Sequence, residues 1–131
     1  MSTDAGAIQS DAATCSSAYN ALMYSVGNNH AGTYYPVLLA AMPFLEQAAM
    51  EGSLWPQRAA LSALDDLFAS FHPEPGYEQA SLNGADSQEI EPVLRRRVRA
   101  LRDSLERIAQ GESPNASIAE SLVDLLNEEA A

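Results

Sequence analysis

The sequence predicts an all-α fold of about five helices joined as antiparallel hairpins. Apolar residues recur at intervals of three and four in five separate segments, and no segment shows the strict alternation of a half-buried strand. Helix-starting and helix-ending residues separate these segments. Prolines stand near the starts (Pro36, Pro56, Pro92), and glycines stand at the ends (Gly27, Gly52, Gly111).

The first two helices are predicted on either side of a short glycine-containing loop. The first covers about 12–26 and ends at Gly27-Asn28, a pair able to adopt a left-handed conformation. Thr33 is predicted to be the N-cap of the second helix, which runs to about Met50. Pro43 lies within the second helix and is expected to bend it, because proline removes one hydrogen bond and clashes with the preceding turn.

The remaining helices are predicted around one long loop. The third helix begins near Pro56 and continues to about residue 71, and residues 72–91 form a loop that carries five acidic residues and no arginine. The fourth helix covers about 92–110 and is rich in arginine. The fifth begins near residue 114 or 115, with Ser117 and Glu120 as a possible capping pair.

Length and composition predict one domain. Residues 1–10 follow no helical period and are expected to be a flexible N-terminus, and residues 11–131 are expected to form a single domain with a substantial apolar core. The start of the chain lacks the basic and apolar regions of a signal peptide, and no apolar run is long enough to cross a bilayer. The expected location is therefore the cytoplasm.

The charge balance favours a basic protein partner and argues against nucleic acid. The chain has 18 acidic and 7 basic residues, giving a net charge of −11. Phosphate binding needs a positive field, which this composition does not supply. Six of the seven arginines fall within 95–107, where they either pair with the protein's own carboxylates or form a patch for an acidic partner.

The sequence offers little material for catalysis or for a metal site. The single cysteine, Cys15, cannot form an internal disulfide and is expected to be a buried thiol. The enzyme hypothesis depends on His30, His72 and Glu74 meeting as an acid–base or metal site. Because no nucleophile, phosphate-loop or helical metal-ligand motif is present, we predict that the protein is not an enzyme and uses no cofactor or metal.

Two sequence segments resemble a known family. The pair of predicted helices over 34–71, with Arg58-Ala59-Ala60-Leu61-x-Ala63-Leu64 opening the second, resembles a HEAT repeat. The fuller string from Gly27 to Pro36, read as Gly-Asn-Asn-His-Ala-Gly-Thr-Tyr-Tyr-Pro and followed by Pro43-Phe44-Leu45, is similar to small bacterial HEAT-like proteins that look like toxin immunity proteins. The resemblance implies a short HEAT-like array of antiparallel helical hairpins.

The same resemblance implies a function in bacterial competition. The expected partner is one cognate secreted toxin with a basic surface, such as a nuclease, which the protein would neutralise by occluding its active site or by locking it in an inactive shape. The alternative is a general HEAT-like protein–protein interaction adaptor with no toxin partner. The sequence leaves open the toxin's identity, the choice between the two modes of inhibition and the oligomeric state.

An array of this kind places alternate connections at the same end. The loops 27–33 and 72–91 should therefore lie on one rim, and the connections 51–56 and 111–114 on the other. The partner-binding residues are expected on the first rim, where aromatic and amide groups lie in a negative field: Asn29, His30, Tyr34, Tyr35, Glu74, Tyr77, Glu78 and Asp86. Adjacent helical residues point about 100° apart, so one of the two tyrosines 34 and 35 should be buried and the other exposed.

Overall fold

The computed structural model describes residues 17, 19–21, 23, 26–28, 32–80 and 88–130. Five helices account for most of them, which confirms the all-α fold: α2 (Val37–Glu51), α3 (Leu54–Ala69), α4 (Ile90–Arg99), α5 (Arg102–Gln110) and α6 (Ala116–Ala130). Several residues between 17 and 26 are also helical. Five unexpected two-residue strands join the loops: β1 (Gly27–Asn28), β2 (Thr33–Tyr34), β3 (His72–Pro73), β4 (Gln79–Ala80) and β5 (Gln88–Glu89).

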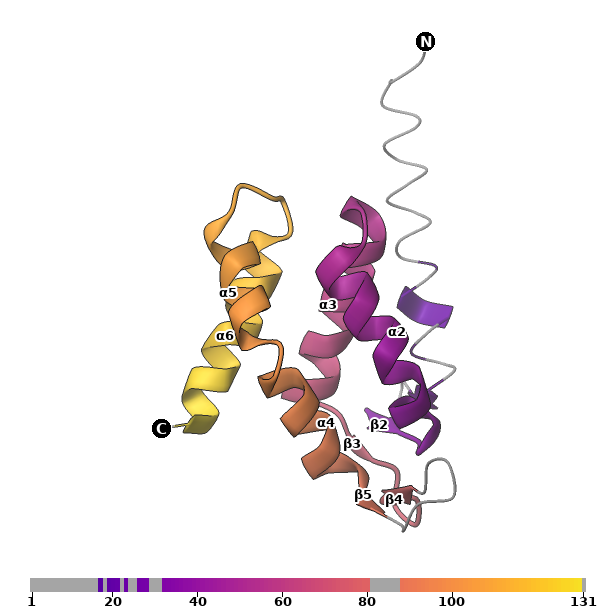
Figure 1. The fold of residues 1–131 in the computed structure, drawn as a ribbon. Helices are drawn as coiled ribbons and strands as arrows, with labels where there is room; N and C mark the ends of the chain where they lie inside the picture. The colour runs from indigo at the N-terminus through magenta and orange to yellow at the C-terminus, as the bar shows by residue number, and fades with distance from the viewer. Residues whose placement is uncertain are drawn as a thin grey trace.

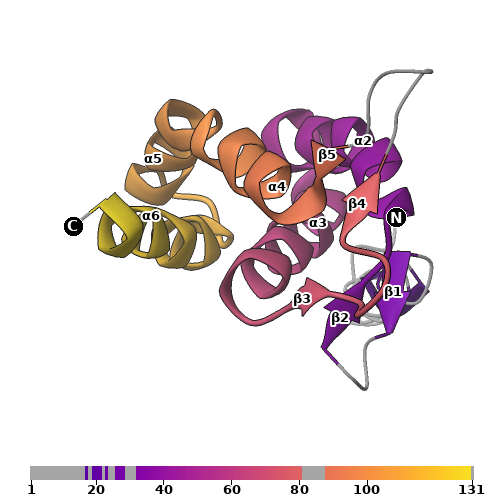
Figure 2. The same ribbon diagram turned by 90° about the horizontal axis from the view of Figure 1, so that it is seen from below.

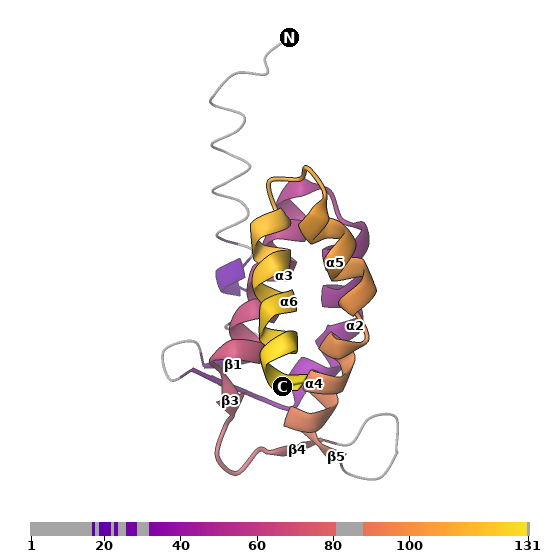
Figure 3. The same cartoon turned by 90° about the vertical axis from the view of Figure 1, so that its left-hand side faces the viewer.

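The helices form two layers (Figures 1 and 2). Helices α2 and α3 make one hairpin, α5 and α6 make a second, and α3 packs against α6 between them. Figure 3 shows α3 and α6 in one layer and α2, α4 and α5 in the other. None of the described helices is both long and apolar enough to cross a membrane.

The apolar stripes predicted from sequence meet between these layers. Helix α3 is the most buried element because its alanines and leucines face both the α2 layer and α6. Leu94 and Val98 of α4 and Leu122 and Leu126 of α6 are at most 2% exposed. Removing this apolar surface from water is the main force holding the layers together.

The predicted fourth helix is in fact two helices. The chain leaves α4 at Ala100 and enters α5 after Leu101, whose N–H donates to the carbonyl of Val98 three residues earlier. This tighter turn redirects the chain. Helix α4 therefore packs against α2 and α3, while α5 packs against α6. Helix α2, by contrast, is continuous through the exposed Pro43, and the bend expected there stays a prediction.

Two predicted helix ends are wrong because strand pairing replaces them. Thr33 lies in β2 and not at a helix N-cap, and Pro36 occupies the N-cap position of α2. Gly27 lies in β1, where β2 approaches so closely that a Cβ atom on Gly27 would lie 2.2 Å from the carbonyl oxygen of Thr33. Gly27 is therefore required for close backbone packing and not for a left-handed helix end.

The two predicted rims are confirmed. On one, β2 pairs antiparallel with β1 and parallel with β3, which brings Thr33 opposite His72 and Tyr34 opposite Pro73. On the other, the fully buried Asn115 donates its side-chain Nδ2 to the carbonyl of Leu54 at 3.0 Å and to Gln57 Oε1 at 2.9 Å. Each rim thus ties together connections that are far apart in sequence.

The Ser117–Glu120 capping pair is a further correction. Helix α6 begins at Ala116, so Ser117 lies inside its first turn, where it is exposed. Asn115 precedes the helix, and its carbonyl accepts the N–H groups of Ile118 and Ala119. Its side chain joins α6 to the start of α3, because a buried amide is stable only when it is hydrogen-bonded.

We expect Gly27→Asn to destabilise the protein by about 1–3 kcal/mol, because its Cβ would collide with the backbone of β2. Urea denaturation followed by circular dichroism measures the change. Asparagine is well tolerated in a left-handed helix end, so unchanged stability would restore the helix-end role for Gly27.

We expect Asn115→Ala to lower stability by about 1–3 kcal/mol, because Leu54 and Gln57 would lose their buried donor. Ser117→Ala is the matched control and should change stability by less than about 0.5 kcal/mol. The same denaturation experiment reports on both variants. A loss of about 1 kcal/mol in Ser117→Ala alone would instead identify Ser117 as the helix cap.

Candidate protein-binding rim

The rim around β2 and β3 separates the two adjacent tyrosines as expected. Tyr34 is 1% exposed and belongs to the apolar core. Burial raises the pKa of its hydroxyl, the charge of Glu91 raises it further, and Arg95 opposes this rise. Since its side chain offers no surface to a partner, the assignment of Tyr34 to the partner-binding set is corrected.

Tyr35 and Tyr77 form an aromatic pair at the surface of this rim. Their ring centroids are 5.7 Å apart and their planes meet at 84°, the edge-to-face geometry that aromatic side chains favour. Tyr77 is 55% exposed and Tyr35 is partly exposed. The pair thus presents a sizeable aromatic surface that is already ordered before any partner binds.

The carboxylates next to this pair are held by the loop that carries them. The Thr33 hydroxyl donates to the carboxylate of Glu74, and the Tyr77 N–H donates to the Glu74 carbonyl at 2.8 Å. The N–H of Gly76 donates to both carboxylate oxygens of Glu78, at 2.7 and 3.0 Å. Gly76 has a φ of 89°, a conformation that favours glycine, so the turn itself positions Glu78.

More acidic residues line a shallow hollow beside Glu78. The hollow has a volume of about 360 Å³ and is lined by Pro73, Glu78, Glu89, Glu91 and Pro92. Glu89 is exposed at the start of α4, and Glu91 lies 3.7 Å from Arg95. We call Tyr35, Glu74, Tyr77, Glu78, Glu89 and Glu91 together the acidic rim.

Some expected site residues lie outside the described part of the chain: Asn29, His30 and Asp86. Among the expected residues that are described, Tyr35, Glu74, Tyr77 and Glu78 do gather in one region. Glu91 was not expected in the site. The only sequence signal for it is its place at the end of the acidic loop, and the chain turns it toward Pro73 where α4 begins.

Two of the three residues of the catalytic alternative, His72 and Glu74, lie on this rim. His72 is exposed in β3, and the carboxylate of Glu74 accepts a hydrogen bond from Thr33. Within the described residues, no group of three or more His, Cys, Asp and Glu side chains is placed to hold a metal ion. His30, the third residue of that hypothesis, lies outside the described residues.

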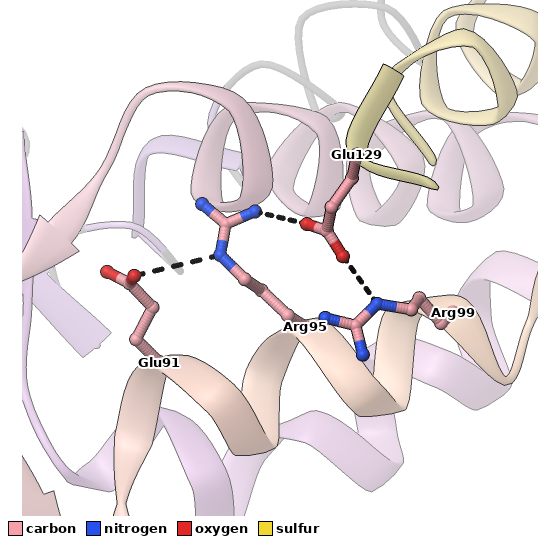
Figure 4. A network of polar contacts seen from close by, with 4 residues as sticks. All are labelled: Glu91, Arg95, Arg99 and Glu129. Atoms are coloured by element: carbon pink, nitrogen blue, oxygen red, sulfur yellow. Dashed lines mark hydrogen bonds and ion pairs between the residues drawn. The ribbon is translucent and has the colours of Figure 1, made fainter. Parts of the chain in front are cut away.

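The arginine-rich segment pairs with the protein's own carboxylates (Figure 4). Arg95 and Arg99 of α4 bind the two carboxylate oxygens of Glu129 on α6, at 2.7 and 2.5 Å. Arg95 also lies 4.7 Å from the ring centroid of Phe68, close enough for a cation–π contact. These contacts confirm the self-paired interpretation for Arg95 and Arg99 and connect α4 to α6.

Arg97 makes the same kind of contact, but with a carboxylate of α2 instead of α6. Its guanidinium donates to both carboxylate oxygens of Glu46 on α2, at 2.6 and 2.7 Å. The hydrogen bonds that Arg97 donates to Glu46 raise the pKa of Arg97, although partial burial opposes this. A bidentate pair of this geometry both orients and stabilises the packing of α4 on α2.

Comparisons with known proteins found no match among protein-family models, curated proteins or solved structures. Its function is therefore inferred from the chemistry of its surface.

The Glu129 network should make stability depend on pH. Desolvation acts to raise the pKa of Glu129, but its hydrogen bonds and charge interactions with Arg99 and Arg95 outweigh desolvation and hold the pKa below its ordinary value of 4.5. A carboxylate with a lowered pKa stabilises the fold above its unfolded-state pKa, and this contribution is lost as the pH falls through the folded-state pKa.

We therefore expect Glu129→Gln to be less stable than the wild type by about 0.5–1 kcal/mol at neutral pH. The difference should shrink as the pH falls below 4.5, which urea denaturation across the pH range would show. Glu128→Gln is the control, since Glu128 is exposed and forms no hydrogen bond or ion pair with the described residues. A deficit of constant size at every pH would contradict this role for Glu129.

Proposed function

We propose that the protein is an immunity protein that binds and neutralises a basic secreted bacterial toxin through its acidic rim. The observation that carries the proposal is the exposed Tyr35–Tyr77 pair held beside the fixed carboxylates of Glu74 and Glu78. Exposed tyrosines are common anchors of protein interfaces, and ordered side chains lose little entropy on binding.

The charge distribution supports a basic partner. The described rim contributes four carboxylates, from Glu74, Glu78, Glu89 and Glu91, and residues 72–91 contain no lysine or arginine. Among the described residues, Glu91 is the rim carboxylate that pairs with an arginine, Arg95, which also binds Glu129, whereas Glu74, Glu78 and Glu89 form no such pair. A field of one sign steers an oppositely charged protein toward the rim and raises the association rate.

Neutralisation follows if the basic surface that the rim covers is the toxin's own active site. A nuclease, for example, must present cations to phosphate groups, and the rim carboxylates would compete for those cations. Occlusion of this kind predicts that the toxin's substrate and this protein exclude one another. If the protein instead locks the toxin from a second site, the toxin should bind its substrate and this protein at the same time.

The proposal is tested by capturing partners of the full chain from lysate of its source organism and coexpressing the leading partner. A single partner that kills cells alone but is tolerated together with this chain supports the immunity role. Ordinary cytosolic partners without toxicity would favour the general adaptor instead.

With that partner in hand, Glu89→Lys should slow association several-fold at low salt and weaken its salt dependence, because Glu89 is exposed on the rim. Glu112→Lys is the matched control, since it makes the same charge change at an exposed position on the opposite rim. Tyr77→Ala should mainly accelerate dissociation. Stopped-flow or surface-plasmon measurements separate the two rates, and equal effects of the two lysine variants would exclude the acidic rim as the interface.

A further inference from the structure

Helix α2 exposes apolar side chains on the face that points away from the core. Phe44 is 75% exposed and Val37 is 50% exposed, and Ala40 between them is exposed as well. These three residues follow the three-and-four spacing of a helix–helix seam. An exposed phenylalanine in such a seam indicates a contact surface more strongly than a single scattered apolar residue does.

This face is directed away from the neighbouring helix α4. Glu46, which binds Arg97 of α4, is nine residues after Val37, and nine steps of about 100° place the two side chains on opposite sides of α2. The apolar seam is therefore not the surface on which the second hairpin packs, and its exposure shows that the described chain leaves it largely uncovered.

The last helix of the array is different. The exposed positions of α6 are polar or charged, including Glu120, Asp124 and Asn127. A polar outer face is what ends a stack of helical hairpins in water. The C-terminal hairpin thus has a solvated outer face, whereas α2 in the N-terminal hairpin keeps an apolar one.

The charge distribution indicates what covers the seam. From Ala12 to Leu45 the sequence contains no Asp, Glu, Lys or Arg, although the whole chain carries a net charge of −11. Within α2, Glu46 pairs with Arg97 and Glu51 is exposed at the C-terminal end, so the uncharged part of the face runs from Val37 to Phe44. A basic partner is attracted to the acidic rim and gains no charge interaction on this uncharged part. Two copies of the chain repel each other over their acidic surfaces, and the uncharged face is where they approach at the least electrostatic cost.

We infer that α2 pairs with α2 of a second copy, antiparallel and about a two-fold axis that passes near Phe44. In this arrangement, a residue a given number of positions after Phe44 faces the residue that lies the same number of positions before Phe44 in the second copy. Ala48 then faces Ala40 of the second copy, and Glu51 faces Val37 of the second copy. A two-fold interface of this kind uses the same patch twice.

The surface has a hollow that matches this register. It has a volume of about 240 Å³ and is lined by Phe44, Gln47, Ala48, Glu51 and Gly52. Val37 of the second copy, about 10.5 Å along the helix from the axis, reaches the Gly52 end of this hollow. Because of the symmetry, the exposed Val37 side chain enters an equivalent hollow on each copy, and the two Phe44 rings meet at the axis.

A single pair of helices buries less surface than a standard stable interface, so the dimer belongs to the weak, concentration-dependent class. We expect a dissociation constant on the order of 10–100 µM. Added salt should strengthen the dimer because it screens the repulsion between two acidic molecules, whereas salt should weaken binding of a basic partner at the rim. The dimer does not depend on the proposed immunity function.

Sedimentation velocity of the full chain from roughly 1 to 500 µM tests the inference. The mass should rise from 14.0 kDa toward twice that value, and Phe44→Ser should remain monomeric. Tyr77→Ser is the matched control, because it also removes an exposed aromatic ring but lies on the acidic rim, and it should dimerise like the wild type. Circular dichroism shows that both variants are folded. A wild-type monomer at every concentration, or a dimer unaffected by Phe44→Ser, overturns the inference.

Disulfide trapping tests the register. Ala40→Cys and Ala48→Cys are made separately in a Cys15→Ser background, mixed and oxidised. The antiparallel pairing predicts a mixed disulfide between the two variants and little of either homodimer. Homodimeric disulfides alone, or none in a sample that sedimentation shows to be dimeric, would overturn the proposed arrangement.

Discussion

Strand β2 is the element on which the acidic rim depends, because within the described chain it pairs with a neighbour on both edges. Its partners, β1 and β3, come from segments about 45 residues apart, and Tyr34 anchors it by filling the core. The hydrogen bond from the N–H of Glu74 to the carbonyl of Tyr34 fixes the start of the loop that carries Tyr77 and Glu78. The order of the rim therefore derives from a buried tyrosine and a few backbone hydrogen bonds.

The second determinant is the way in which charge is distributed over the molecule. Arginines of α4 are used internally, on Glu46 and Glu129, and so connect α4 to α2 and α6. Among the rim carboxylates only Glu91 pairs with an arginine of the described chain, Arg95, and the α2 face from Val37 to Phe44 carries no charge. The chain thus has two surfaces of different chemistry. One is the acidic rim, and the other is the apolar face of α2.

Much of the fold could be predicted from sequence, and the errors at the helix ends share one cause. The helix periods, the buried stripes and the two rims were predicted correctly, since these follow from spacing and connection length. Thr33, Gly27 and Ser117 were misassigned as helix-end residues because each has the right local chemistry for that role. Strand pairing and the start of α6 at Ala116 decided their actual roles, and neither can be read from the local sequence.

Sequence by itself determined the all-α class, the acidic character and four of the six residues of the acidic rim, because periodicity and composition are properties of the chain. Only the tertiary structure decided that Tyr34 is core while Tyr35 joins Tyr77, that Glu91 lies beside Pro73, and that the predicted fourth helix divides after Arg99. Exposure and pairing depend on which distant segments meet, and that outcome minimises the free energy of the whole fold and not of any one segment.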